Sequence, residues 1–157
     1  MGQQPVEGAP APAFDLASSS GARVSSQGLK GRAYLLYFYP KDDTPGCTVE
    51  ACEFGQRHPQ FKKAGVPVYG VSPDDLKSHA KFIQKFGLPF ELLSDEGHAV
   101  AEAYGLWVEK NNFGHTYMGV QRASFLIGKD AKVLKAWPKV KAEGHAEEVL
   151  AAAKELL

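Results

Sequence analysis

The sequence predicts an α/β fold in which a mixed central sheet is flanked by helices and preceded by an N-terminal β-hairpin. Two observations lead to this prediction. Short apolar runs alternate with helical segments through the middle of the chain, which is typical of parallel strands joined by crossover helices. A second hairpin pattern near the C-terminus adds antiparallel strands, so the sheet is expected to be mixed.

The chain is expected to begin with a flexible arm and a hairpin. The start, MGQQPVEGAPAPAF, is rich in Pro, Gly and Ala, and residues 1–10 are interpreted as the arm. The segment AFDLASSSGARVSS then indicates a short hairpin that turns at Ser20 and Gly21. The run AYLLYFYP is continuously apolar and ends at Pro40, which indicates a strand covered on both faces.

Helices and strands are expected to alternate after this strand. The chain is predicted to be helical to about residue 64, with Gly55 and Pro59 as interruptions. VPVYGVS indicates a strand, and PDDLKSHAKFIQKFG a helix that ends at Gly87. FELLSD indicates a strand and GHAVAEAYG a short helix. The apolar positions of the longer second helix recur at helical spacing, namely Leu76, Ala80, Ile83 and Phe86.

The C-terminal part of the chain completes the pattern. RASFLIGKDAKVLKAWP predicts a hairpin that turns at residues 128–131. EGHAEEVLAAAKELL predicts an amphipathic helix rich in strong helix formers. We therefore expect one domain over residues 1–157, in the order hairpin, three β-α units, hairpin and helix.

Length and composition exclude several classes of protein. The 157 residues are 44% hydrophobic and 23% charged, as in ordinary globular domains. The formal net charge of zero gives no bulk attraction to nucleic acid or an anionic membrane. No apolar run approaches the roughly 20 residues that span a bilayer, and the N-terminus lacks the basic and apolar regions of a secretory signal. A cytoplasmic protein without nucleic-acid or membrane partners is expected.

The two cysteines of the chain, Cys47 and Cys52, stand together in YPKDDTPGCTVEAC. A single pair is too small a set for a disulfide-stapled secreted scaffold, and it points to redox chemistry or a metal site. Zinc is disfavoured because a structural site needs four ligands and the imidazoles lack ligand spacing. The five histidines are scattered along the chain: His58, His79, His98, His115 and His145.

Cys47 is predicted to lie in the first turn of a helix, just beyond the carboxyl end of the strand that Pro40 terminates. Thr44 suits the N-cap and Pro45 the first helical position, while Gly46 permits close approach of another molecule. The unpaired N–H groups and the dipole of that turn favour a thiolate. A buried structural cysteine is the alternative, but burial alone does not require a Thr-Pro-Gly turn at a helix start.

The segment YFYPKDDTPGCTVEACEF resembles the active-site motif of the peroxiredoxins, Pro-x-x-x-Thr-x-x-Cys, with a Glu three residues further on. GLWVEKNNFGHTYMGVQRASFLI resembles the second signature of the bacterioferritin comigratory protein and peroxiredoxin Q subfamily. The likeness runs from about Gly8 to the C-terminus. It implies a thioredoxin-like fold, and reduction of hydrogen peroxide and organic hydroperoxides by a cysteine without a metal or organic cofactor.

The resemblance also implies a role for each motif residue. Cys47 is the peroxidatic nucleophile, Thr44 offers its hydroxyl to the thiolate and the peroxide, and Pro40 shields the site from water. Arg122 stabilises the thiolate and orients the substrate, and Glu50 holds Arg122. Without the resemblance, Thr44 would be interpreted as an N-cap and Pro40 as a strand terminator. Arg122 would be a surface ion-pair residue and Glu50 a solvated helix acid.

The position of Arg122 relative to Cys47 depends on how two strands pair. If the strand at Ala123–Ile127 is an antiparallel neighbour of the strand before Pro40, its start lies at the sheet edge where Cys47 lies. Arg122 is then beside Cys47.

The apolar residues Trp107 and Met118, together with Tyr117, form either a wall for alkyl hydroperoxides or the edge of a core, and the core edge is the safer interpretation.

Cys52 raises a geometric problem. A sulfenic acid at Cys47 condenses readily with a thiol. On an ideal helix the Cα atoms of residues five apart are about 8.7 Å from each other, whereas a disulfide needs less than about 7 Å. The helix must therefore unwind if Cys52 is to resolve the sulfenic acid, and many members of the subfamily have a resolving cysteine at this spacing. Otherwise Cys52 is a small core residue, and an external thiol resolves.

The resemblance implies reduction of that disulfide by thioredoxin or glutaredoxin, and it favours a monomer because both thiols are in one chain. Two other functions stay open at this point. A general thiol–disulfide oxidoreductase on the same fold normally uses Cys-x-x-Cys and does not need Arg122. A non-catalytic binding or holdase protein needs only a structural cysteine pair.

Overall fold

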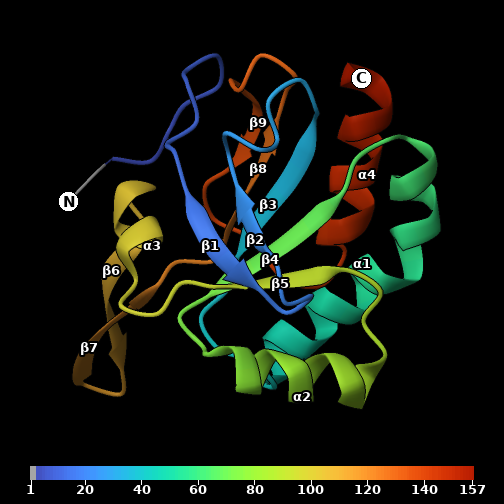
Figure 1. The fold of residues 1–157 in the computed structure, drawn as a ribbon. Helices are drawn as coiled ribbons and strands as arrows, with labels where there is room; N and C mark the ends of the chain where they lie inside the picture. The colour runs from blue at the N-terminus through green and yellow to red at the C-terminus, as the bar shows by residue number, and fades with distance from the viewer. Residues whose placement is uncertain (1–2) are drawn as a thin grey trace.

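The computed structural model describes residues 3–157 and contains a seven-stranded mixed sheet with helices on both faces (Figure 1). The predicted fold class is confirmed. Strands β3, β4 and β5 are parallel, while β8 is antiparallel to β3 and β1 is antiparallel to β5. The order across the sheet is β2 (Arg23–Ser25), β1 (Asp15–Ser18), β5 (Glu91–Ser94), β4 (Val68–Ser72), β3 (Tyr34–Phe38), β8 (Ala123–Ile127) and β9 (Val133–Trp137).

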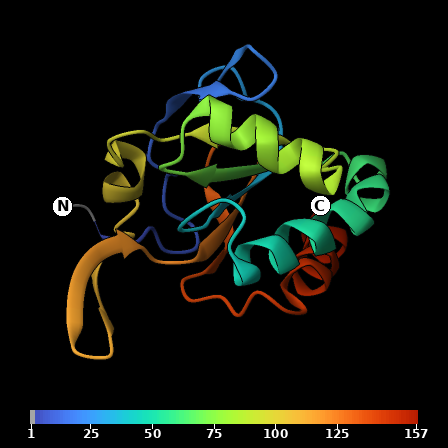
Figure 2. The same ribbon diagram turned by 90° about the horizontal axis from the view of Figure 1, so that it is seen from below.

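Three helices cover one face of the sheet and a shorter helix covers the other (Figures 1 and 2). The connections from β3 to β4 and from β4 to β5 step in the same direction across the sheet. Because such crossovers share one hand, both helices fall on the same face. These are α1 (Pro45–Lys63) and α2 (Leu76–Phe86), joined by α4 (His145–Leu156), whereas α3 (Ala99–Ala103) lies on the opposite face.

The central strand β3 is buried on both faces, as its apolar run predicts. Tyr34 and Leu36 point into the core under α3, while Leu35 and Tyr37 point into the core under α1, α2 and α4. Every residue of β3 is at most 2% exposed. The alternation of side chains along a strand divides the apolar residues between the two cores. The carboxyl end of β3 leads into the loop before α1.

Helix α1 runs through Gly55 and Pro59 without a break, so the expected interruptions are wrong. Phe54 and Phe61 are completely buried on either side of Pro59, and their packing holds the two halves of the helix in line. Gly55 serves a close contact instead. A Cβ atom there would lie 3.2 Å from Cδ of Pro89.

The inward face of α2 is only partly the expected one, since Ile83 and Phe86 pack against the core. His79 and Phe82 are buried, whereas Leu76 is 37% exposed and Ala80 is also exposed. The helix begins and ends as predicted, with the Asp75 side chain accepting a hydrogen bond at its N-cap and Gly87 in the left-handed conformation at its C-cap. The polar His79 is inside because it has hydrogen-bond partners there, which apolar spacing cannot reveal.

A hairpin not predicted from the sequence links α3 to β8. It consists of β6 (Trp107–Asn112) and β7 (His115–Val120), and it extends away from the sheet and helices (Figure 2). Phe113 and Gly114 form its turn with positive φ angles of 53° and 83°. The signal for this hairpin is the Asn-Asn-Phe-Gly turn, in which the Asn111 side chain accepts a hydrogen bond from the Gly114 amide.

The predicted N-terminal arm is held against the sheet at its C-terminal end. The Gly8 amide donates to the Val133 carbonyl at 2.8 Å, and the Val133 amide donates to Ala9 at 2.9 Å. Met1 and Gly2 lie outside the described residues. Within residues 3–157, no helix combines the length and the apolar character needed to cross a bilayer.

Candidate active site

The connection from β3 to α1 places Cys47 at the start of a long helix. Thr44 occupies the N-cap with an extended backbone, and Pro45 is the first helical residue. The Thr44 hydroxyl donates to the Lys41 carbonyl at 3.0 Å and does not cap the helix. The N–H groups of Gly46 and Cys47 have no acceptor within the helix, so they are available to an oxygen atom near the sulfur. Cys47 itself is 1% exposed.

Arg122 contacts Cys47 although the two residues are 75 positions apart in the sequence. Its Nη2 atom donates to the Cys47 Sγ atom at 3.2 Å. The contact follows from the sheet, because Ala123 at the start of β8 pairs with Phe38 at the end of β3. Gly46 leaves room for it, since a Cβ atom at that position would lie 3.2 Å from Nη2 of Arg122. The guanidinium therefore neutralises a thiolate directly.

Glu50 lies one turn further along α1 and holds the same guanidinium. Its Oε1 atom accepts from Nη1 of Arg122 at 2.5 Å. Glu50 is 1% exposed, so the alternative of a solvated helix acid is wrong. Burial raises the pKa of Glu50 to about 7, although the charge of Arg122 opposes that rise. The second oxygen, Oε2, has no hydrogen-bond partner among the described residues.

Cys52 lies on the same helix, five residues after Cys47, and both thiols are free. It is partly exposed, and burial of its sulfur raises the pKa of the thiol. A surface hollow beside it is lined by Gly55, Phe86 and Leu88, among others. Because α1 is intact over both positions, the Cα atoms of Cys47 and Cys52 keep the separation of an ideal helix, which is too long for a disulfide. A disulfide between them therefore requires the helix to open.

A cavity of about 440 Å³ adjoins the loop before α1. Pro40 and Thr44 line one side of it, and Trp107, Tyr117 and Met118 of the hairpin line the other. Tyr117 and Met118 are 44% and 43% exposed, so the interpretation as a core edge is wrong for these two, whereas Trp107 packs against the core as expected. The hairpin instead forms an apolar wall beside the site.

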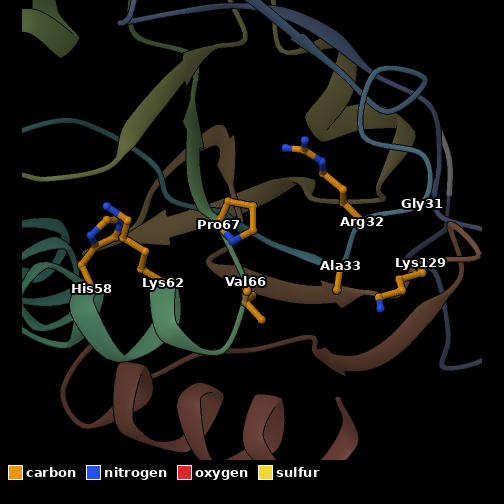
Figure 3. Close-up of a pocket in the computed structure, with 9 residues that line it drawn as sticks. Gly31, Arg32, Ala33, His58, Lys62, Val66, Pro67 and Lys129 are labelled. Carbon is orange, nitrogen blue, oxygen red and sulfur yellow. The ribbon is translucent and has the colours of Figure 1, made fainter.

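Another cavity, of about 480 Å³, lies at the opposite end of the sheet (Figure 3). Its lining includes four basic side chains, two from α1 and two from the neighbourhood of β3 and β8. They do not converge on a common point in Figure 3. The site residues predicted from the sequence lie at the other end of β3. The four basic residues are Arg32, His58, Lys62 and Lys129.

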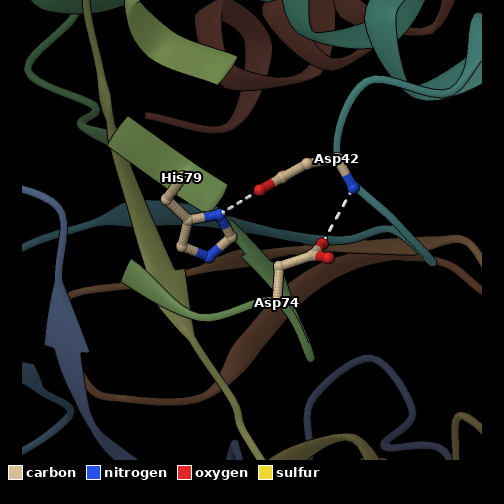
Figure 4. A group of neighbouring side chains, drawn as sticks. All are labelled: Asp42, Asp74 and His79. Carbon is tan, nitrogen blue, oxygen red and sulfur yellow. Dashed lines mark hydrogen bonds and ion pairs between the residues drawn. The ribbon is translucent and has the colours of Figure 1, made fainter. Parts of the chain in front are cut away.

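Sequence reasoning missed a largely buried polar cluster beside the loop between β3 and α1, formed by Asp42, Asp74 and His79 (Figure 4). His79 Nδ1 lies 2.7 Å from Oδ2 of Asp42, and the Asp42 amide donates to Oδ2 of Asp74 at 2.8 Å. Both ring nitrogens of His79 are engaged, the second with the Leu93 carbonyl at 2.9 Å. Because these atoms are already hydrogen-bonded, the cluster is a network between protein groups. The signal in the sequence that could have revealed this cluster is a polar histidine on an otherwise apolar helix face.

Comparison with known proteins places this geometry in context. Residues 8–136 match the AhpC/TSA family. The chain is 50% identical over 143 residues to the putative peroxiredoxin Bcp of Coxiella burnetii, which covers 91% of this chain and 95% of the relative. It is 45% identical over 149 residues to peroxiredoxin Bcp of Bacillus subtilis, with 95% of each chain covered. The bacterioferritin comigratory protein of Xanthomonas campestris, studied for its alkyl peroxide reduction activity, superimposes with a TM-score of 0.88 at 40% identity, covering 96% of this chain and 98% of that one.

Proposed function

The chain belongs to the AhpC/TSA family and is a peroxiredoxin of the Bcp and peroxiredoxin Q type, and from this premise we propose that it reduces hydroperoxides at Cys47. The observation that carries the proposal is the 3.2 Å contact between the Arg122 guanidinium and the Cys47 sulfur. The sulfur lies in the first turn of α1, where helix N–H groups also favour an anion. Hydrogen peroxide and organic hydroperoxides are the substrates.

The first step transfers one oxygen atom to sulfur. The Cys47 thiolate attacks one oxygen of ROOH, the O–O bond breaks, and the other oxygen leaves as RO⁻ and takes a proton to give ROH. Cys47 becomes a sulfenic acid. Negative charge moves from sulfur to the leaving oxygen, so fixed donors aimed at that oxygen stabilise the transition state more than the ground state.

Three kinds of donor serve this step. Arg122 supplies a permanent positive charge, and Glu50 holds it in place. The free N–H groups of the first turn of α1 supply oriented dipoles. The Thr44 hydroxyl, which donates to Lys41 in the resting site, turns toward the peroxide when substrate is present. Pro40 covers the site and keeps water from the sulfur.

The second step forms a disulfide within the chain. The Cys52 thiol attacks the Cys47 sulfenic acid and releases water, after the first turns of α1 have unwound. No second subunit is required, which is consistent with a monomer. A dithiol protein, thioredoxin or glutaredoxin, then reduces the disulfide and is itself oxidised. It docks on the exposed face of the unwound segment, where Val49 is 41% exposed.

The experiment that tests the function counts thiols. One equivalent of hydrogen peroxide is added to the reduced protein, and free thiols are measured by mass spectrometry. We expect loss of both thiols and a mass decrease that corresponds to one disulfide. Cys47→Ser should abolish peroxide consumption, and peroxide turnover by that variant would contradict the proposal.

A matched variant separates the two steps. Cys52→Ser should still consume one equivalent of peroxide and accumulate a sulfenic acid that dimedone traps at Cys47. If Cys52→Ser turns over at the wild-type rate with thioredoxin, the resolving role of Cys52 is wrong while the peroxidatic role of Cys47 stands. Coupled assays with thioredoxin or glutaredoxin in place of a small thiol identify the reductant.

A further inference from the structure

A buried pair of ionisable side chains joins the loop between β3 and α1 to α2. Asp42 and His79 have side chains that are 4% and 0% exposed, and Oδ2 of Asp42 is 2.7 Å from Nδ1 of His79. Nε2 of His79 lies 2.9 Å from the Leu93 carbonyl oxygen. Figure 4 shows the imidazole of α2 directed at the loop that carries Asp42.

Hydrogen-bond partners surround the histidine and the aspartate. A backbone carbonyl only accepts hydrogen bonds, so Nε2 must carry a proton. The carboxylate of Asp42 already accepts from the Tyr39 hydroxyl at 2.5 Å and from the Ser78 hydroxyl at 2.8 Å, so it acts as an acceptor toward Nδ1 as well. Both ring nitrogens of His79 are therefore held, one by Asp42 and one by Leu93, in a site closed to water.

Asp42 is placed where this pair controls the catalytic loop. It stands two residues after Pro40 and two before Thr44. Its amide donates to Asp74 at 2.8 Å, so both its backbone and its side chain are held. The next residue, Asp43, has a φ of +58°, a left-handed conformation that few residues other than glycine, asparagine and aspartate adopt.

We propose that Asp42 and His79 are positioning residues that anchor the catalytic loop, fixing Pro40 and Thr44 relative to the peroxide. The anchor joins the loop to α2 and β5, elements that carry none of the groups proposed to contact the peroxide. It also marks where helix opening stops, because the loop stays fixed at Asp42 while the chain beyond Thr44 unwinds. This inference rests on the function proposed above for Cys47.

The anchor and the arginine act on different parts of the site. The contact of Arg122 with Cys47 comes from the start of β8, and it does not pass through Asp42 or His79. Loss of the anchor therefore leaves the thiolate and its guanidinium in place while Thr44 loses its position. Oxidation by peroxide, which needs both sides of the site, should slow, whereas alkylation of the thiolate, which needs only the sulfur, should not.

The test compares these two reactions in Asp42→Asn, both measured in a Cys52→Ser background. Asn keeps the shape of Asp but replaces one carboxylate oxygen by an NH₂ group, so the contacts of Asp42 with Tyr39, Ser78 and His79 cannot all be kept. Oxidation of Cys47 by hydrogen peroxide is followed by rapid quenching and mass spectrometry, and alkylation by iodoacetamide in the same way. We expect oxidation to slow by roughly tenfold or more and alkylation to stay within about twofold.

Two further variants make the result decisive. Ser78→Ala removes one hydrogen bond to Asp42 and should slow oxidation in the same sense but less, even if Asp42→Asn does not fold. Lys85→Ala removes an ion pair between Lys85 and Asp43, whose side chains are 59% and 46% exposed respectively. It should change neither the oxidation rate nor the alkylation rate. Equal loss in Lys85→Ala, or unchanged oxidation in Ser78→Ala or in folded Asp42→Asn, would overturn the anchor. These outcomes leave the role of Cys47 to be judged separately by Cys47→Ser.

Discussion

Replacing Glu50 by Gln should change how the stability of the protein depends on pH. Glu50 is almost completely buried, and burial raises its pKa from 4.5 to about 7 despite the adjacent guanidinium. In the unfolded chain the carboxyl returns to its ordinary pKa. Between those two values the folded protein holds a proton that the unfolded chain has released. Folding stability therefore falls as pH rises through this window.

The size of the effect follows from the same rise in pKa. It corresponds to about 3 kcal/mol of stability that is present below pH 4.5 and lost above pH 7. Gln cannot ionise, so this contribution disappears in Glu50→Gln. The Gln carbonyl still accepts from Nη1 of Arg122, and the cost of placing its NH₂ group where Oε2 lacks a partner does not vary with pH.

The assay is urea denaturation of the reduced wild type and of Glu50→Gln at several pH values from 4.5 to 8. Subtracting the two curves cancels other groups, among them His145, whose pKa is lowered by burial. We expect the free energy of unfolding of the variant, relative to wild type, to increase by about 3 kcal/mol across the range. A flat difference would refute the reasoning, because it would mean that Glu50 ionises equally easily in both states.

Three further substitutions test contacts of α1, and a fourth, at the hairpin tip, is a control. Gly46→Ala places a methyl group 3.2 Å from Nη2 of Arg122, so peroxide oxidation in stopped-flow assays should fall at least about tenfold with little change in melting temperature. Pro59→Ala restores an amide donor inside the helix and should raise the free energy of unfolding in urea by about 1–3 kcal/mol; no gain would show that the helix already accommodates the ring. Phe54→Ala, at a completely buried position, should cost about 3–5 kcal/mol, whereas Phe113→Ala at the exposed hairpin tip should stay within about 0.5 kcal/mol by the same measurement.

Much of the fold could be predicted because its signals are local. The strand that became β3 is an unbroken apolar run, and the caps of α2 are an aspartate and a glycine at its two ends. The missed hairpin has weak signals, since most of β7 is exposed and carries no alternating apolar pattern. The continuity of α1 was mispredicted because propensity counts Pro59 against the helix, while the burial of Phe54 and Phe61 is a tertiary effect.

The site divides in the same way. Thr44, Pro45 and Cys47 lie within four residues, so the turn that they form could be predicted from the local sequence. Arg122 lies 75 residues from Cys47, and its place beside the sulfur became predictable only with an assumed strand pairing. The burial of Glu50 and the cluster of Asp42, Asp74 and His79 could not be predicted, because both depend on which side chains the packed helices bring together.

The sequence by itself determined the order of strands and helices and the helix-start cysteine, because those depend on neighbouring residues and on the period of apolar side chains. The tertiary structure alone decided that Glu50 is buried against Arg122, that His79 is buried against Asp42, and that Tyr117 and Met118 face a cavity. The physical reason is that burial and electrostatic pairing are properties of the space between elements, and that space exists only after the chain has folded.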